Sequence, residues 1–250
     1  MAQNSEAKTK TALADPRTRI VDALMSLAAE RRFEDISIRD ICETAGVTLA
    51  DFRDAFPSKG AVLAGFTRRI DRIVLAADDS EIAKEAPRER LFDVLMRRLD
   101  AMAPYREALR AILGWLRRDP VAALAMNQAI VKSMRFMLEA AGLESAGVAG
   151  AIKLQGLALA WARIVDVWLY DAEPELSKTM AALDRELDRG QRAVANVERF
   201  DRITAPLRAV AVAAFETRKR AREAFYKRPG EGEEPRDAGS PPSSEGKHQI

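Results

Sequence analysis

The chain has 250 residues, which is long enough to bury a sizeable core in one large domain or two smaller ones. Its 40 Lys and Arg side chains nearly balance 38 Asp and Glu, so a net charge of +2 excludes no class of partner. The single cysteine excludes an internal disulfide, and no apolar run approaches the ~20 residues of a membrane helix. We therefore expect a cytoplasmic protein with no stable insertion in a membrane.

The N-terminal end is polar and has little to bury, so residues 1–16 are expected to form a flexible arm. Residues 17–31 then place Ile20, Leu24 and Leu27 at helical spacing, which predicts an amphipathic helix. This helix opens the part of the chain that we expect to be ordered.

Residues 37–56 carry the pattern around which the chain is organised. Ser37 can cap a short helix whose apolar register includes the only cysteine, Cys42, which we expect to be buried. Gly46 supplies the backbone freedom that a sharp turn needs, and Thr48 can cap a second helix. Two short helices joined by a turn with glycine form a helix-turn-helix unit, whose second helix fits a DNA major groove. An ordinary corner between two helices is the alternative interpretation of the turn alone.

The run from Arg19 to Ile70 resembles the DNA-binding domain of the TetR family of repressors. The matching residues are Ala28, Phe33, Ile38, Ile41, Ala45, Gly46, Val47, Phe52, Phe56, Pro57, Ser58, Lys59 and Leu63. The resemblance implies a helix-turn-helix domain over residues 17–75, which binds a palindromic double-stranded DNA operator as part of a homodimer. The DNA-binding residues that it implies are Arg39, Thr48, Leu49, Asp51, Phe52, Arg53 and Lys59. Thr48 and Lys59 match family positions that contact the DNA backbone.

The second helix of this unit departs from the family pattern. Arg53 stands where the family usually has Tyr, and Ala55 replaces a frequent His. Asp51 and Asp54 bring two carboxylates towards the DNA phosphates. Basic and acidic side chains nearly balance over residues 1–75, so the positive excess typical of DNA-binding domains is missing. Asp51 stays compatible with base recognition, because a carboxylate accepts a hydrogen bond from cytosine N4.

Helical periodicity continues through the rest of the chain, without an alternating β pattern. Helices are predicted over residues 58–75, 88–102, 105–116, 120–141, 147–170 and 176–190. The predicted fold class is all-α: an N-terminal three-helix helix-turn-helix domain followed by a helical ligand-binding and dimerisation bundle over residues 76–195. Residues 196–228 are predicted to form a basic amphipathic helical segment, and residues 229–250 a disordered tail.

Large apolar side chains of the predicted bundle are candidates for a binding site. In the TetR resemblance such helices enclose a pocket for a small hydrophobic ligand, and methionine adapts well to variable ligands. The candidate ligand-binding residues are Trp115, Met126, Met134, Met137, Trp161 and Trp168, with Phe136 beside them. A plain packed core is the alternative for each. Residues 147–170 are apolar around most of the helix, so with residues 176–190 we expect them to form the homodimer interface.

Motifs that carry catalytic chemistry are missing from the sequence. There is no nucleotide-binding glycine loop, no Cys/His metal spacing and no nucleophile elbow. The only histidine, His248, lies in the predicted tail. We therefore expect no catalytic residue, no metal and no cofactor, and we do not expect an enzyme.

A shorter segment, Ala162–Leu187, is similar to the C-terminal part of the lipid-binding proteins of coenzyme Q biosynthesis. The shared residues are Trp168, Asp171, Thr179, Leu183, Asp184, Arg185 and Leu187. Those proteins have a TetR-like fold, have lost DNA binding, bind isoprenoid lipids and touch membranes through an amphipathic C-terminal helix. Two functions therefore stay open. One is a TetR-type repressor released from its operator by a small hydrophobic ligand; the other is a TetR-like lipid-binding protein without DNA binding.

Overall fold

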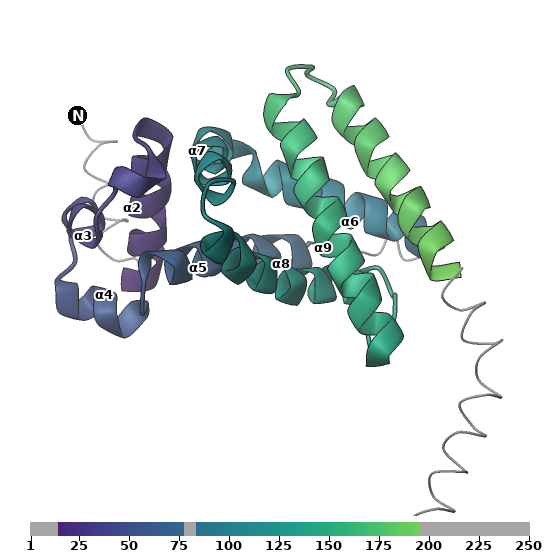
Figure 1. Ribbon diagram of the computed structural model, residues 1–250, viewed down its shortest axis with the longest axis horizontal. Helices are drawn as coiled ribbons and strands as arrows, with labels where there is room; N and C mark the ends of the chain where they lie inside the picture. Colours follow the sequence, from purple (N-terminus) through teal and green to yellow (C-terminus); the bar gives the residue numbers. More distant parts are fainter. Residues whose placement is uncertain (1–14, 78–83, 196–250) are drawn as a thin grey trace, which may run out of the picture. The chain divides into compact units, whose positions relative to one another are not determined.

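The computed structural model describes residues 15–77 and 84–195 of the chain. Contacts divide the chain into two units, Met1–Glu198 and Arg199–Ile250, and every described residue belongs to the first. Helices and turns make up the described residues, with no strand among them (Figure 1). The predicted all-α fold class is therefore confirmed. The basic segment and the tail predicted beyond residue 195 lie outside the described residues, as does the predicted arm up to residue 14.

The predicted helices are present with small shifts at their ends. In chain order they are α2 (Pro16–Glu30), the 3-10 turn η1 (Phe33–Asp35), α3 (Ile38–Ala45), α4 (Leu49–Ala55), α5 (Lys59–Leu75), α6 (Pro87–Met102), the 3-10 turn η3 (Ala103–Tyr105), α7 (Arg106–Leu116), α8 (Pro120–Ala140), α9 (Gly147–Tyr170) and a last helix over residues 177–195. The last helix runs at least five residues past its predicted end at residue 190. No helix in the described ranges has the length and apolar character needed to cross a bilayer.

Side-chain caps explain where several helices begin. The hydroxyls of Ser37, Thr48 and Ser58 each accept a hydrogen bond from a backbone amide three residues on, at 3.1–3.2 Å. Asp119 caps α8 in the same way, with its carboxylate 2.9 Å from the Ala122 amide. Gly46 ends α3 in the left-handed conformation at φ 62°, as the sharp turn requires. These predicted start and stop signals are confirmed.

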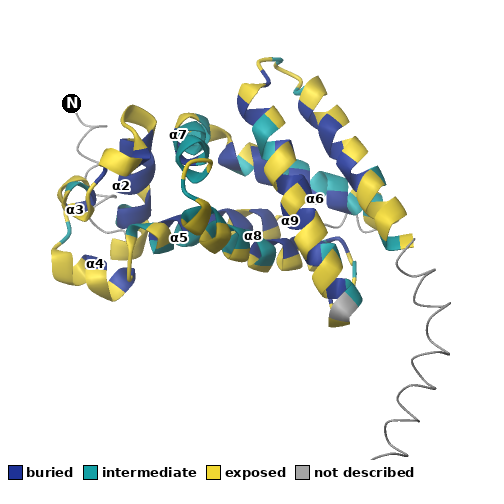
Figure 2. Cartoon of the chain, in the orientation of Figure 1, coloured by how far each residue is buried: buried dark blue, intermediate teal, exposed yellow. Residues whose placement is uncertain are grey.

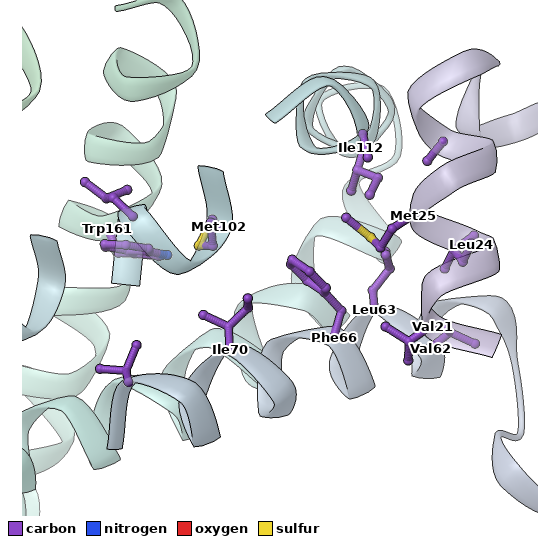
Figure 3. Close-up of a cluster of buried hydrophobic side chains, with 14 of the residues drawn as sticks. Val21, Leu24, Met25, Val62, Leu63, Phe66, Ile70, Met102, Ile112 and Trp161 are labelled. Carbon is purple, nitrogen blue, oxygen red and sulfur yellow. The ribbon is translucent and has the colours of Figure 1, made fainter. Parts of the chain in front are cut away.

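Helix α5 is the central element of the described core. It packs against α2, α6 and α8. Figure 3 shows Phe66 and Ile70 of α5, with Met25 and Ile112 from α2 and α7 near one end and Trp161 of α9 near the other. These side chains belong to one continuous hydrophobic cluster, which is buried throughout. Helix α5 therefore links the helix-turn-helix unit to the remaining helices through a shared core.

The C-terminal end of α9 is held by two arginines of α7. Arg106 donates to the Asp171 carbonyl at 3.0 Å, and Arg110 donates to the Leu169 carbonyl at 2.6 Å. Carbonyls at a helix C-terminus have no partner within the helix and carry the negative end of its dipole, so guanidinium groups stabilise them. The Arg106 guanidinium also lies over the Trp168 ring, 4.5 Å from its centroid. These contacts fix the end of α9 against α7.

The turn after α9 is shaped by Asp171, one of the residues shared with the coenzyme Q proteins. Its buried carboxylate accepts hydrogen bonds from the amide and the hydroxyl of Thr179, at 2.9 and 2.7 Å. It also accepts one from the Glu173 amide at 3.2 Å. Asp171 and Thr179 therefore have a structural role, which is to direct the chain into the last helix.

Candidate nucleic-acid interface and ligand core

Both helices of the helix-turn-helix unit begin with a reciprocal capping box. The Asp40 carboxylate accepts from the Ser37 amide at 2.8 Å, while the Ser37 hydroxyl accepts from the Asp40 amide. The Asp51 carboxylate accepts from the Thr48 amide at 2.9 Å and from its hydroxyl at 2.7 Å. Hydrogen bonds from the cap residue's amide and hydroxyl hold the pKa of each carboxyl below its usual range. The two boxes fix the start of both helices.

Asp51 therefore has a local role that the sequence analysis did not assign. The sequence predicts only a DNA contact for Asp51, but one of its carboxylate oxygens accepts both hydrogen bonds from Thr48. The signal was available, because a Ser or Thr followed three residues later by an acidic residue is the pattern of a capping box. That pattern occurs at Ser37 and again at Thr48.

The outer faces of α3 and α4 carry most of the predicted DNA-binding side chains. Arg39, Thr48, Leu49 and Arg53 are exposed, and Figure 2 shows these two short helices with long stretches of exposed surface. Phe52 is the exception, since its side chain is only 3 % exposed and points into the core of the unit. The prediction that Phe52 contacts DNA is wrong, because a buried ring cannot reach a base or a phosphate.

Lys59 turns its ammonium group inward. The Nζ atom donates to the carbonyls of Phe33 and Ile36, at 2.7 and 2.8 Å, and lies over the Phe33 ring, 4.4 Å from its centroid. Burial lowers the pKa of Lys59. Two of the three ammonium donors are therefore used within the protein, where they hold the segment between α2 and α3 against the start of α5.

The same segment is held from the other side by α7. The Phe33 ring is fully buried, and its centroid lies 4.4 Å from that of Trp115. Glu34 pairs with Arg32 at 3.0 Å and with Arg118 at 2.5 Å. Its own backbone amide, and then these two arginines, lower the pKa of Glu34 to about 2. Trp115, a candidate ligand-binding residue, thus has one ring face occupied by Phe33.

The other candidate ligand-binding residues are mostly part of the core. Met134, Met137, Trp161 and Trp168 are buried, and Met126 is half-buried against the same cluster. Phe136 is 52 % exposed, so it lies outside the buried cluster that contains the other candidates. Helix periodicity explains the difference, because Phe136 follows Met134 by two residues and therefore lies on another face of α8.

A buried polar cluster lies inside this core and was not predicted. Arg98 of α6 is only 2 % exposed and donates to Asp71 of α5, which also accepts from the Ser133 hydroxyl of α8 at 2.6 Å. The Arg98 guanidinium lies 5.3 Å from the centroid of the Trp161 ring, with Nη1 3.9 Å from the Met137 sulfur. Burial lowers the pKa of Arg98 and the Asp71 carboxylate opposes that shift, so the guanidinium stays charged. The Arg98 Nε atom is buried without a hydrogen-bond partner.

The acidic side chains of the described residues do not form a metal site. No group of three His, Cys, Asp or Glu side chains within residues 15–77 and 84–195 is arranged to hold a metal ion. Cys42 is buried, as expected from its position in the apolar register, and its thiol lies 3.9 Å from the Thr48 carbonyl.

Comparison with solved structures gives the fold its name. No family model matches the sequence, and no curated protein matches it at a significant level. The chain is similar to a TetR transcriptional regulator from Rhodococcus sp. RHA1, at 20% identity and a TM-score of 0.52, over 70% of this chain and 95% of that one. It is also similar to the TetR transcriptional regulator from Nitrosomonas europaea ATCC 19718, at 22% identity and a TM-score of 0.55, over 70% and 97% of the two chains.

These two similarities confirm the fold that the TetR resemblance implied. Neither protein is described as a lipid-binding protein of coenzyme Q biosynthesis, so that second resemblance stays a prediction. The chain has the fold of the TetR transcriptional regulators.

Proposed function

We propose that the chain is a sequence-specific DNA-binding transcriptional regulator, a repressor that a small hydrophobic ligand releases from its operator. The observation that carries the proposal is the helix-turn-helix unit, whose two helices are joined at a left-handed Gly46 and fixed by two capping boxes. Its outer face presents Arg39 and Arg53 to solvent. A rigid short helix with exposed arginines is suited to the major groove, where arginine forms paired hydrogen bonds to guanine.

The proposed DNA contacts fall into two groups. Arg39, Leu49 and Arg53, which are exposed, are proposed to read base edges or contact phosphates, while Thr48 and Asp51 hold the start of α4. Lys59 is assigned a positioning role, because its ammonium already holds two carbonyls of the segment before α3. The domain division proposed here keeps residues 17–75 for DNA and residues 76–195 for ligand and dimer contacts, with α5 shared by both cores.

A homodimer is proposed from the exposed apolar face of α9. Ile152, Leu159, Val167 and Tyr170 are between 37% and 62% exposed on that helix, and Met180 of the last helix is 37% exposed. These exposed apolar side chains recur at helical spacing along α9, and burial of them against a second copy favours association. Two recognition helices related by a two-fold axis then require a palindromic operator with half-sites about 34–36 Å apart.

Selection from random DNA duplexes at physiological salt tests this function. The full chain is expected to enrich a palindrome, whereas recovery of no preferred sequence contradicts the proposal. Arg53→Ala should relax the preference within each half-site, at a cost of about 1–3 kcal/mol if the side chain is bidentate to guanine. Arg135→Ala is the matched control, since it removes the same charge from an exposed position on α8 and should leave the selected sequence unchanged.

A further inference from the structure

We propose that Arg98 binds the anionic group of the ligand, so that the ligand is a hydrophobic acid and not a neutral hydrophobic molecule. The inference rests on the proposed function, because it takes the candidate ligand-binding residues Met134, Met137 and Trp161 as the binding region. It adds a chemical class for the ligand and a residue that selects it. The starting observation is the buried position of Arg98 among these side chains.

The hydrogen-bonding capacity of Arg98 is incompletely used. A guanidinium has five N–H donors in a planar fork, a geometry that suits a carboxylate approached by two parallel bonds. Here Nη1 carries the bond to Asp71, and the buried Nε has no partner. An unpaired buried donor is costly. A ligand carboxylate that reaches the Nε edge of the fork therefore gains a strong, charge-assisted hydrogen bond.

The groups around Arg98 suit the apolar part of such a ligand. The Met137 sulfur lies 3.9 Å from Nη1, and the Trp161 ring centroid lies 5.3 Å from the centre of the guanidinium. Methionine side chains are unbranched and rearrange readily, which lets a core of this composition admit an additional molecule. Met134 and Met137 both come from α8 and are fully buried in the same cluster.

The charge of a ligand determines whether it can separate Arg98 from Asp71. Asp71 is the carboxylate that pairs with Arg98 in the core, and a buried cation without an anion is strongly unfavourable. A neutral ligand therefore cannot separate Arg98 from Asp71 and take its place. A ligand acid can, because the guanidinium exchanges one carboxylate for another and keeps its counter-charge. The released Asp71 carboxylate keeps the Ser133 hydroxyl as a donor and turns to solvent, to which its side chain is already 11% exposed. Arg98 thus excludes neutral molecules of the same shape.

The exchange also acts on α5, which begins at the helix-turn-helix unit. Asp71 lies on the same helix as Lys59, and it is bonded to Arg98 of α6 and Ser133 of α8. Replacement of Asp71 by a ligand carboxylate removes one of the polar ties between α5 and α6. Ligand binding is therefore coupled to the position of the helix that carries the DNA-binding unit.

Thermal unfolding of the full chain with matched probe molecules tests the proposal. The probes are hexanoate, decanoate, tetradecanoate and naphthoate, each below its micellar concentration and each compared with its methyl ester and its alcohol. At least one acid is expected to raise the unfolding midpoint and to bind about tenfold to a hundredfold more tightly than its ester, the range expected for a charged hydrogen bond. If no acid stabilises the protein, or if esters and acids stabilise it equally, the proposal is wrong.

Three variants sharpen the test. Asp71→Asn removes the competing carboxylate, so it should strengthen binding of the acid about tenfold. Arg98→Lys keeps a charge but loses the planar fork, so it should weaken acid binding about tenfold. Asp71→Leu combined with Arg98→Met replaces the pair by apolar groups and should fold, since such replacements of buried pairs are often neutral for stability. This double variant must lose all preference for acid over ester; a retained preference contradicts the proposal.

The result is separable from that of the operator experiment. Thermal stabilisation does not require DNA, so a chain that binds acids but selects no operator keeps this inference and loses the proposed repressor function. A chain that selects an operator but shows no response to any acid keeps the repressor function and loses this inference.

Discussion

Two charged side chains of α5 turn inward, and their surroundings differ. Lys59, at the start of the helix, donates hydrogen bonds from its ammonium group to two neutral backbone carbonyls and is half-buried. Asp71, further along, is 8% exposed and is bonded to the charged Arg98 and to the Ser133 hydroxyl. One end of α5 is therefore held by a half-buried lysine on neutral acceptors, and the other by opposite charges inside the core.

The two ends of α5 differ in the group that is left without a partner when one side chain is removed. The Phe33 and Ile36 carbonyls are neutral and Lys59 itself is only half-buried, so water can take the place of its ammonium group when the lysine is lost, and the cost is limited. A buried guanidinium without its carboxylate has no such substitute, because the side chains around it form an apolar cluster that offers no second anion. The Asp71 end is therefore more sensitive to single substitutions, and the following predictions test that ranking from the largest effect to the smallest.

The largest loss of stability is expected for Asp71→Ala. This change leaves Arg98 charged and unpaired in the core, so the free energy of unfolding should fall by about 3–5 kcal/mol. Denaturant unfolding of the full chain at neutral pH measures the change. Asp54→Ala is the matched control, since it removes an exposed carboxylate from α4 and should alter stability by less than about 0.5 kcal/mol. Equal losses for both variants contradict the ranking.

A smaller effect is expected for Lys59→Met. The methionine keeps most of the apolar stem but removes the two hydrogen bonds to Phe33 and Ile36, at a cost of about 1–2 kcal/mol. The same unfolding experiment reports it, with Lys132→Met on the exposed face of α8 as the control. A loss that exceeds that of Asp71→Ala reverses the comparison between the two ends of α5.

The cap of α4 should contribute less to stability than the Lys59 hydrogen bonds do. Thr48→Ala removes the hydroxyl that accepts from the Asp51 amide, so we expect a loss of about 1 kcal/mol. Thr44→Ala, on the exposed surface of α3, makes the same chemical change without a cap and should be close to neutral. Because the cap positions the recognition helix, DNA affinity should also fall in the first variant and not in the second.

The smallest effect is a pH dependence at the contact between η1 and α7. The pKa of Glu34 is lowered from 4.5 to about 2, so its contribution to stability is present above pH 4.5 and is lost as the pH falls towards about 2. Glu34→Gln should therefore destabilise the protein slightly at neutral pH, and the difference from the wild type should shrink in acid. A difference that stays constant over this range would falsify the assignment.

Local features of the fold could be predicted from the sequence. The bounds predicted for α9, Gly147 and Tyr170, are those of the structure, and the caps predicted at Ser37 and Thr48 are confirmed. These features depend on residues within a few positions of one another, where periodicity and capping chemistry are informative. The fold class followed from the same local patterns.

The inward-facing charges could not be predicted in this way. Arg98 stands next to Arg97 on α6, and neither charge nor spacing in the sequence separates the buried arginine from its neighbour. Its partner Asp71 lies 27 positions away in the chain, and Ser133, which donates to Asp71, lies 62 positions from Asp71. Nothing in helical periodicity pairs these residues. Lys59 likewise bonds carbonyls 26 and 23 residues earlier. Long-range pairing of this kind depends on how the helices pack, which one sequence does not reveal.

The burial of Phe33 beneath Trp115 has a consequence for synthesis of the chain. The ring is fully buried in the finished fold, but its cover comes from α7, which is translated only after α5 and α6. At about 5–20 residues per second, translation from the end of α5 to the end of α7 takes roughly 2–8 seconds. During that interval the Phe33 ring lacks its Trp115 cover, so the nascent chain exposes apolar surface that the finished fold buries.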